Sequence, residues 1–187
     1  MEPGKLLETL AVAGRLKEVP RHCVMAGGRR ESVAEHCWRA ALMAYFLRDE
    51  FPEADMDRVI AMCLIHDLGE AFTGDIPAFR KTAEDEQEEE RRLYDWIETL
   101  PQPYAGEMLA LYGEMAALQT TEAKIYKAID NMETVIQHNE SPLESWLPEE
   151  YPLNLTYGTD KAAFSAYLTA LRAAVREETE RKIAEGK

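Results

Sequence analysis

Apolar residues recur every three to four positions along most of the chain, which is the spacing of one face of an α-helix. No segment alternates apolar and polar residues convincingly, as a half-buried β-strand would. The pattern predicts helices over residues 5–18, 33–47, 56–72, 82–100, 104–118, 121–139 and 160–183. We therefore expect an all-α, single-domain helical bundle.

The apolar stripes of these helices predict which side chains face the core. They are Leu6, Leu7, Leu10 and Ala13; Val33, Cys37, Ala40, Ala44 and Leu47; Leu93, Trp96, Ile97 and Leu100; Ile125, Ile129, Met132 and Ile136; and Phe164, Tyr167, Leu168 and Leu171. Ser32 and Glu35 form an S-x-x-E capping box that starts the second helix. The acidic run 84–90 is interpreted as a solvated face. Residues 140–159, rich in Pro and aromatics, are expected to form a long connection that covers a site.

Composition narrows the class of protein. The chain has 187 residues and a net charge of −14, which argues against a nucleic-acid polymer as the partner. Residues 1–30 nevertheless hold six basic and three acidic side chains, a local balance that suits a small anionic ligand. Three cysteines without a CxxC pair indicate buried, reduced thiols. No apolar run of membrane-spanning length or signal peptide is evident, so we expect a cytoplasmic protein without membrane contact.

One stretch, "CLIHDLGEAFTGDIP" at residues 63–77, places charged groups in an apolar setting. His66 and Asp67 follow an apolar run, and Glu70 and Asp75 come shortly after. On one continuous helix, His66, Asp67 and Glu70 would occupy a single sector. Because unpaired buried charge is costly, a bound divalent cation is the expected compensation.

A single helix cannot fill a coordination sphere, so other helices must supply ligands. His36 lies in the first turn of the capped helix, and Asp130 borders the apolar stripe of residues 121–139. The remaining histidines, His22 and His138, are interpreted as ordinary polar residues. The expected metal ligands are therefore His36, His66, Asp67 and Asp130.

Three segments, "ESVAEHCWRAALMAYFL", "CLIHDLGEAFTGDIP" and "KAIDNMETVIQH", resemble in this order the HD-domain metal-dependent phosphohydrolases. The resemblance is greatest to the 5′-deoxynucleotidase branch, which releases phosphate from deoxynucleoside monophosphates. It implies a helical, cytoplasmic, commonly homodimeric enzyme that uses one divalent metal ion. Two-metal members need further histidines between the HD pair and the last Asp, and residues 68–137 contain none. We expect one HD domain over residues 1–187, with its metal-site core at about 31–139 and a C-terminal loop and helix at 140–187.

The resemblance also suggests roles around the metal. Glu70 is expected to act on the attacking water or the leaving oxygen, and Asp75 to orient water or a sugar hydroxyl. Arg21 matches an arginine that these deoxynucleotidases use near the phosphate. In the bacterial branch a sugar-shaping tryptophan follows that arginine, but here His22 does, which leaves deoxyribose and ribose both open. The donor set suits Mn, Co, Ni, Fe, Zn or Mg.

Four charged residues near these motifs have less specific interpretations. Arg29 and Arg30 are interpreted as exposed loop charges, Lys127 as structural, and Glu122 as orienting its neighbours.

Two other functions remain compatible with the sequence. One is a nucleoside triphosphate or pyrophosphate hydrolase, which would need more cationic groups than the N-terminal cluster offers. The other is a non-catalytic HD-like module that binds a nucleotide or metal. Retention of Glu70 and Asp75 beside the candidate ligands favours the monophosphatase over this module.

Overall fold

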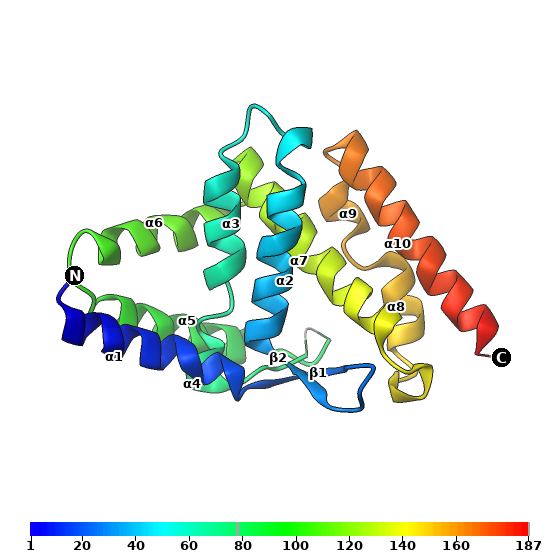
Figure 1. Cartoon of the computed structure of the whole chain (residues 1–187), viewed down its shortest axis with the longest axis horizontal. Coiled ribbons are helices and arrows are strands. Elements are labelled where there is room, and N and C mark those ends of the chain that lie inside the picture. Colours follow the sequence, from blue (N-terminus) through cyan, green and yellow to red (C-terminus); the bar gives the residue numbers. More distant parts are fainter. Residues whose placement is uncertain (78, 187) are drawn as a thin grey trace.

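The computed structural model describes residues 1–77 and 79–186, and a long helix, α7 (Thr121–Glu140), runs through its centre (Figure 1). The Thr120 side chain caps this helix by accepting a hydrogen bond from the Ala123 amide. Around it pack α2 (Val33–Phe46), α3 (Met56–Ile65), α6 (Tyr104–Ala117) and α10 (Ala166–Glu185). The other elements are α1 (Pro3–Gly14), β1 (Pro20–Val24), β2 (Arg30–Ser32), α4 (Glu70–Thr73), α5 (Ala83–Ile97), α8 (Glu150–Thr156), α9 (Thr159–Ala162) and 3-10 turns at Arg15–Lys17, Arg48–Glu50 and Leu143–Ser145. The all-α prediction is confirmed, with one small hairpin added.

The N-terminus of α2 forms as the sequence predicts. The Ser32 side chain accepts from the Glu35 amide, and the Glu35 carboxylate accepts from the Ser32 amide. The predicted stripe of α2 is buried throughout: Val33, Cys37, Ala40, Ala44 and Leu47. Helix α2 packs mainly against α3 and also against α7. The cap therefore fixes where α2 begins, and with it the position of His36 in the first turn.

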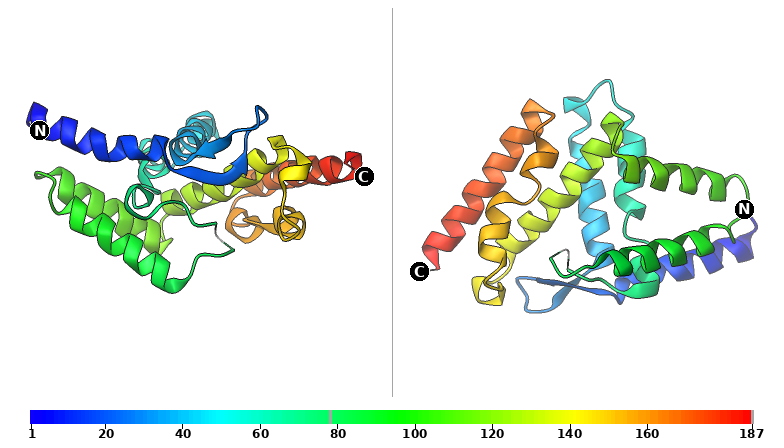
Figure 2. Two further views of the ribbon diagram at one scale, coloured as in Figure 1. Left: turned by 90° about the horizontal axis from the view of Figure 1, so that it is seen from below. Right: turned by 180° about the vertical axis from the view of Figure 1, so that it is seen from behind.

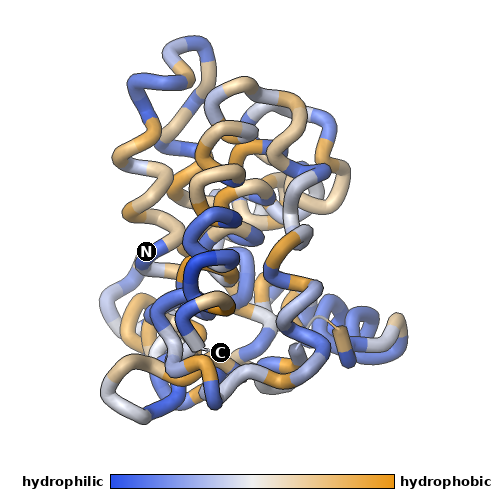
Figure 3. The backbone as a smooth tube through the Cα atoms, turned by 90° about the vertical axis from the view of Figure 1, so that its right-hand side faces the viewer, coloured by the Kyte–Doolittle hydropathy of each residue, from blue (hydrophilic) through white to orange (hydrophobic). Residues whose placement is uncertain are grey.

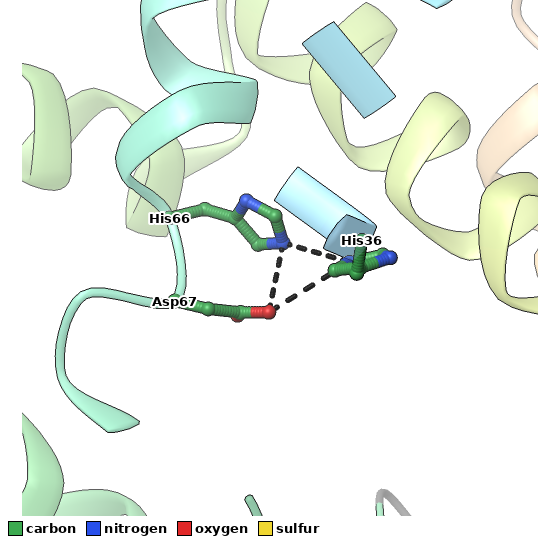
Figure 4. A group of neighbouring side chains, drawn as sticks. All are labelled: His36, His66 and Asp67. Atoms are coloured by element: carbon green, nitrogen blue, oxygen red, sulfur yellow. Dashed lines mark hydrogen bonds and ion pairs between the residues drawn. The ribbon is translucent and has the colours of Figure 1, made fainter. Parts of the chain in front are cut away.

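The predicted helix over 56–72 is wrong in one respect that shapes the site. Helix α3 ends at Ile65, and residues 66–69 form a tight turn before α4. Within this turn the Leu68 amide bonds to the Ile65 carbonyl and the Glu70 amide to the Asp67 carbonyl, both three residues back. Such tighter winding frequently ends an α-helix. The turn places His66 at the end of α3 and Asp67 just beyond it (Figure 4).

The expected inward faces of the first and last helices are only partly correct. Leu6, Leu7 and Leu10 of α1 are exposed, Leu7 by 69%, because α1 lies along the edge of the molecule (Figure 2). Phe164 is also exposed and lies before the final helix, which begins only at Ala166, and Tyr167 is exposed in the first turn of that helix. Leu168 of the same predicted face is fully buried, and Leu171 packs against the core.

Two segments expected to be irregular contain regular structure. Strands β1 and β2 pair antiparallel, with Pro20 opposite Ser32 and Val24 opposite Arg30. Gly28 has a φ of +86° in the hairpin turn, a conformation that glycine adopts without strain. Residues 140–159 contain α8 and begin α9, which pack against α10. Pro and Gly interrupt the apolar periodicity of both segments and so hide their short elements.

Hydrophobic and hydrophilic stretches follow one another turn by turn along the helices, as expected for amphipathic helices around a common core (Figure 3). The centre of the core consists of fully buried side chains: Met62, Ile97, Ile125, Ile129, Met132 and Leu168. The prediction of buried, free cysteines is confirmed for Cys23, Cys37 and Cys63. Among the described residues, no helix combines the length and apolar character needed to cross a membrane.

Candidate metal centre

Four side chains from three elements meet beside the turn that follows α3. His36 comes from the first turn of α2, His66 and Asp67 from the turn, and Asp130 from the middle of α7. The Nε2 atoms of the two imidazoles lie 3.1 Å apart. Asp67 Oδ2 lies 3.2 Å from His66 Nε2 and 3.7 Å from His36 Nε2 (Figure 4). Asp130 Oδ1 lies 3.2 Å from His36 Nε2 and 3.5 Å from His66 Nε2.

The other nitrogen of each imidazole is already engaged. His36 Nδ1 donates to the Glu133 carboxylate, and His66 Nδ1 donates to the Cys63 carbonyl at 3.0 Å. In a neutral imidazole that donates through Nδ1, Nε2 carries a lone pair. The two Nε2 lone pairs and two carboxylate oxygens therefore converge on one point. A cation placed among these four electron donors would offset their mutual repulsion.

The spacing of these atoms fits a single metal ion. Ligands about 2.1 Å from a common ion lie about 3.0–3.4 Å apart, depending on the angle between them. Most of the separations above fall near this range, and imidazole nitrogen with carboxylate oxygen is a usual donor set for first-row divalent metals. In the described part of the chain, one ligand atom from each of His36, His66 and Asp67 lies within 4.8 Å of the other two, so these three residues could hold a metal ion together.

Both carboxylates are held in the charged form that a metal ligand needs. Burial alone would raise the pKa of Asp67, but His66 and then His36 lower it below its usual range. Burial likewise opposes ionisation of Asp130, yet Lys127 and the two imidazoles bring its pKa well below normal. Lys127 Nζ donates to Asp130 Oδ2 at 2.7 Å, which leaves Oδ1 facing the imidazoles. This contact supports the structural interpretation of Lys127.

Glu133 is the important residue that sequence reasoning missed. It is fully buried, accepts from His36 Nδ1, and receives a hydrogen bond from Arg39 Nε at 2.6 Å. Burial opposes its charge, but His36, Arg21 and Arg39 lower its pKa to about 2. Its position three residues after Asp130, on the same face of α7, was the available signal. Partners of this kind orient a metal-bound histidine and raise its basicity.

Replacing Glu133 with glutamine should weaken metal binding about 10- to 100-fold, because His36 loses its charged acceptor. Competition with a chelating dye measures this affinity. Glu140→Gln is the matched control, since Glu140 also bonds to Arg39 but lies at the surface. Equal metal affinity in the two variants would contradict the role assigned to Glu133.

A cavity of about 340 Å³ opens beside these ligands. Glu70, buried and with Oε2 unpartnered among the described residues, lies in its wall. Burial, and then the charges of Asp67 and Asp75, raise the pKa of Glu70 to about 10. Burial also raises the pKa of Asp75, although Arg21 opposes this shift. The cavity therefore brings the two predicted catalytic carboxyl groups and the metal ligands together.

Arg21 projects into the same cavity from β1. Its Nη1 donates to Glu31 at 2.9 Å and to Glu133 at 3.5 Å, and its Nη2 donates to Thr134 at 3.2 Å. These bonds hold the guanidinium in place, and the group has five N–H donors in all. The site thus contains a fixed cation suited to a phosphate oxygen.

The remaining sequence interpretations have mixed outcomes. Arg29 and Arg30 are exposed, as expected, and Arg29 pairs with Glu35. Glu122 accepts from the Asp55 amide at 2.9 Å, at the start of α3. His22 and His138, interpreted as ordinary polar residues, both line the cavity.

Residues 13–172 match the HD domain family. The chain belongs to this family. Among its HD-domain relatives, the human 5′-deoxynucleotidase HDDC2 is 32% identical over 139 residues, which span 72% of this chain and 67% of the human protein. The 5′-deoxynucleotidase hdd1 of Schizosaccharomyces pombe is 28% identical over 131 residues, which span 66% of this chain and 65% of the yeast protein.

Solved structures share the HD-domain architecture. A protein from Magnetospirillum magnetotacticum, described as a predicted metal-dependent phosphohydrolase, aligns with a TM-score of 0.78 at 26% identity and covers 96% of this chain and 93% of its own. A conserved hypothetical protein from Pyrococcus furiosus aligns with a TM-score of 0.71 at 27% identity, covering 91% and 99%. Membership of the HD phosphohydrolases implies dependence on a divalent metal ion, in agreement with the donor group at His36, His66 and Asp67.

Proposed function

We propose that this HD-domain protein is a metal-dependent phosphohydrolase that removes the 5′-phosphate from (deoxy)nucleoside monophosphates. The observation that carries the proposal is one cavity that joins metal ligands, Arg21, the buried carboxyl group of Glu70 and the half-buried carboxyl group of Asp75. Relatives about one-third identical to this chain are named 5′-deoxynucleotidases, which supports the same substrate class.

We assign one divalent ion to His36, His66, Asp67 and Asp130, with Mn, Co, Ni, Fe, Zn and Mg as candidates. When bound, such an ion polarises a phosphoryl oxygen and lowers the pKa of water. Its role requires both carboxylates to be charged and both Nε2 atoms to be free of protons. The Nδ1 hydrogen bonds described above aim each Nε2 at the ion, and the bound ion would take the place of the proton there.

The chain's own residues supply the remaining chemistry. Arg21 binds the phosphate through guanidinium N–H groups that Glu31, Glu133 and Thr134 do not occupy. Glu70 exchanges a proton with the attacking water or with the O5′ leaving group, since it is a buried carboxyl in the cavity wall. Asp75 orients the water or a sugar hydroxyl from the same wall.

The pairing of the cationic side chains favours a monophosphate over a triphosphate. Besides Arg21, the cavity wall contains Lys81 and Lys127. Lys81 pairs with Glu89 at 2.7 Å, and Lys127 pairs with Asp130 at 2.7 Å. Three cations that are each paired with a carboxylate leave little positive charge for a triphosphate chain, whereas one terminal phosphate can use the metal and Arg21.

Product analysis tests the proposed reaction. Metal-stripped protein is resupplied with each candidate ion and incubated with nucleoside monophosphates or, in parallel, with the matching triphosphates. We expect orthophosphate from the monophosphates and little turnover of the triphosphates. The proposal would be refuted if no monophosphate released orthophosphate with any metal. It would also be refuted if the triphosphates released pyrophosphate or triphosphate faster than the monophosphates released orthophosphate.

We also propose that the protein acts in the cytoplasm as a homodimer. The outer face of α2 is apolar and uncharged, with Trp38 exposed by 61% and Phe46 by 72%. On a chain of net charge −14, two copies repel each other least at an uncharged face. Light scattering should give twice the chain mass of 21.3 kDa, and Trp38→Glu should give the monomer mass. A monomeric wild-type protein would refute the dimer.

A further inference from the structure

A buried carboxyl group outside the cavity holds the guanidinium that the proposed reaction uses for phosphate. Glu31 lies on β2, is 1% exposed, and accepts from Arg21 Nη1 at 2.9 Å. Pro20 pairs with Ser32 in the hairpin, which brings the next residue of each strand, Arg21 and Glu31, side by side. Arg21 lines the cavity, whereas Glu31 does not. Glu31 therefore contacts the arginine from the side that faces away from the cavity.

The guanidinium of this arginine has three acceptors among the described residues. Its Nη1 donates to Glu31 at 2.9 Å and to Glu133 at 3.5 Å, and its Nη2 donates to Thr134 at 3.2 Å. Glu133 also accepts from His36 and Arg39, so groups other than this arginine set its position. The contact to Glu31 is the shortest of the three, which makes Glu31 the main determinant of how the guanidinium is oriented.

These contacts leave one edge of the guanidinium available to a ligand. Of its five N–H groups, those of Nη1 face Glu31 and Glu133, and one of Nη2 faces Thr134. Within residues 1–77 and 79–186, Nε and the second N–H of Nη2 have no hydrogen-bond partner. Nε and Nη2 lie along one edge of the planar group, and two parallel N–H groups match two oxygens of a phosphate. The groups that hold Nη1 therefore decide which edge meets the phosphate.

The reach of the Glu31 side chain is more important here than its charge. Burial, and then the charge of Glu133, raise the pKa of Glu31 above its usual value, although Arg21 opposes the shift. Glu133, which shares the same arginine, has a pKa of about 2 and supplies the negative charge. An uncharged side chain that brings an acceptor oxygen to Nη1 can therefore replace Glu31.

We propose that Glu31 is a positioning residue, which holds Arg21 Nη1 so that the edge formed by Nε and Nη2 meets the phosphate of the substrate. This inference rests on the proposed function, because it takes the phosphate to lie at Arg21. Without Glu31, the guanidinium is held only by Glu133 and Thr134, both on α7, and loses its tie to the hairpin. The arginine then meets the phosphate in several orientations, which weakens substrate binding.

Two variants separate the reach of Glu31 from its charge. Glu31→Asp keeps the charge but is one methylene group shorter, so it cannot hold Nη1 at hydrogen-bond distance. It should raise the KM for a nucleoside monophosphate and the inhibition constant of orthophosphate about 10- to 100-fold, with a smaller effect on kcat. Glu31→Gln keeps an acceptor oxygen at full reach, and both constants should stay within about threefold of wild type. A role that depends on charge predicts the reverse order.

Further variants distinguish a positioning role from a merely structural one. In an Arg21→Met background, which lacks the guanidinium, adding Glu31→Asp should change KM less than about twofold. A further tenfold loss in this double variant would overturn the inference, because Glu31 would then act independently of Arg21. Glu18→Asp, at an exposed glutamate two residues before β1, is the control and should behave as wild type. Should Glu31→Asp not fold, Glu31→Met, which fills the space without an acceptor oxygen, replaces it in both comparisons.

The outcomes separate this inference from the function beneath it. Equal KM and equal phosphate inhibition in Glu31→Asp and Glu31→Gln would overturn the positioning role and leave the phosphohydrolase intact. Absence of turnover on every monophosphate would overturn the proposed function, and calorimetric titration of the metal-loaded protein with orthophosphate would then test the inference. Weaker binding to Glu31→Asp than to Glu31→Gln is expected there, and equal binding would contradict the inference. A wild-type protein that binds no orthophosphate would overturn both.

Discussion

Replacing Asp67 with asparagine should lower kcat/KM for phosphate release by about 10³-fold or more and remove the bound metal. Asp67 Oδ2 faces both imidazoles, at 3.2 Å from His66 Nε2 and 3.7 Å from His36 Nε2. Asparagine preserves the shape of the side chain but removes the negative charge that a divalent cation needs. Metal-ion stabilisation of a phosphoryl transition state is worth several kcal/mol, which corresponds to a loss of this size.

Metal content by mass spectrometry and phosphate release by a colorimetric assay measure the two effects on the Asp67 variant. Asp57→Asn is a matched control, because Asp57 also belongs to α3 but is exposed and pairs with Arg48 at the surface. It should retain wild-type metal content and activity. An Asp67 variant that keeps one metal per chain and most of its activity would show that this carboxylate is not a ligand.

Replacing Glu70 with glutamine should lower kcat about 10²- to 10⁴-fold while leaving metal content unchanged. Glu70 is buried in the cavity wall, one short turn beyond Asp67, and its Oε2 has no partner among the described residues. Glutamine fills the same space but cannot exchange a proton with water or the leaving oxygen. A loss in kcat without a loss of metal assigns Glu70 to the chemical step.

The Glu70 variant also separates an enzyme from a binding module. Glu84→Gln, an exposed glutamate in the first turn of α5, controls for a general effect of removing charge. If Glu70→Gln retains wild-type turnover, the buried carboxyl has no catalytic role. If metal content falls together with activity, Glu70 belongs to the metal-binding set instead.

The helical fold could be predicted from the sequence because burial on one face imposes a 3.6-residue period. The capping box of Ser32 and Glu35 fixed the start of α2 by local chemistry alone. Other features depended on long-range packing. The stripe of Leu6, Leu7 and Leu10 is a sound helical pattern, yet these side chains stay exposed along α1. The break after Ile65 was hidden because its residues keep helix-like spacing while the hydrogen bonds tighten.

The candidate ligands could be named from the sequence because His66 and Asp67 are adjacent and His36 and Asp130 lie at recognisable helix positions. Their partners were harder to identify. Glu133 looks like any helical glutamate until His36 and Arg39 are seen to converge on it. Glu150 appears within an acidic, Pro-rich segment, and only the packing of α8 brings it between His22 and His138. Most of these contacts join residues more than ninety positions apart, and such contacts leave no local pattern in the sequence.

The most direct test of the central claim is a titration of metal-stripped protein with Mn²⁺ or Co²⁺, following phosphate release from a deoxynucleoside monophosphate. We predict no phosphate release without metal. The rate of phosphate release should then rise linearly with added metal and level off at one ion per chain. Activity that persists in the stripped protein, or a rise that continues to two ions per chain, would contradict a single metal held by His36, His66, Asp67 and Asp130.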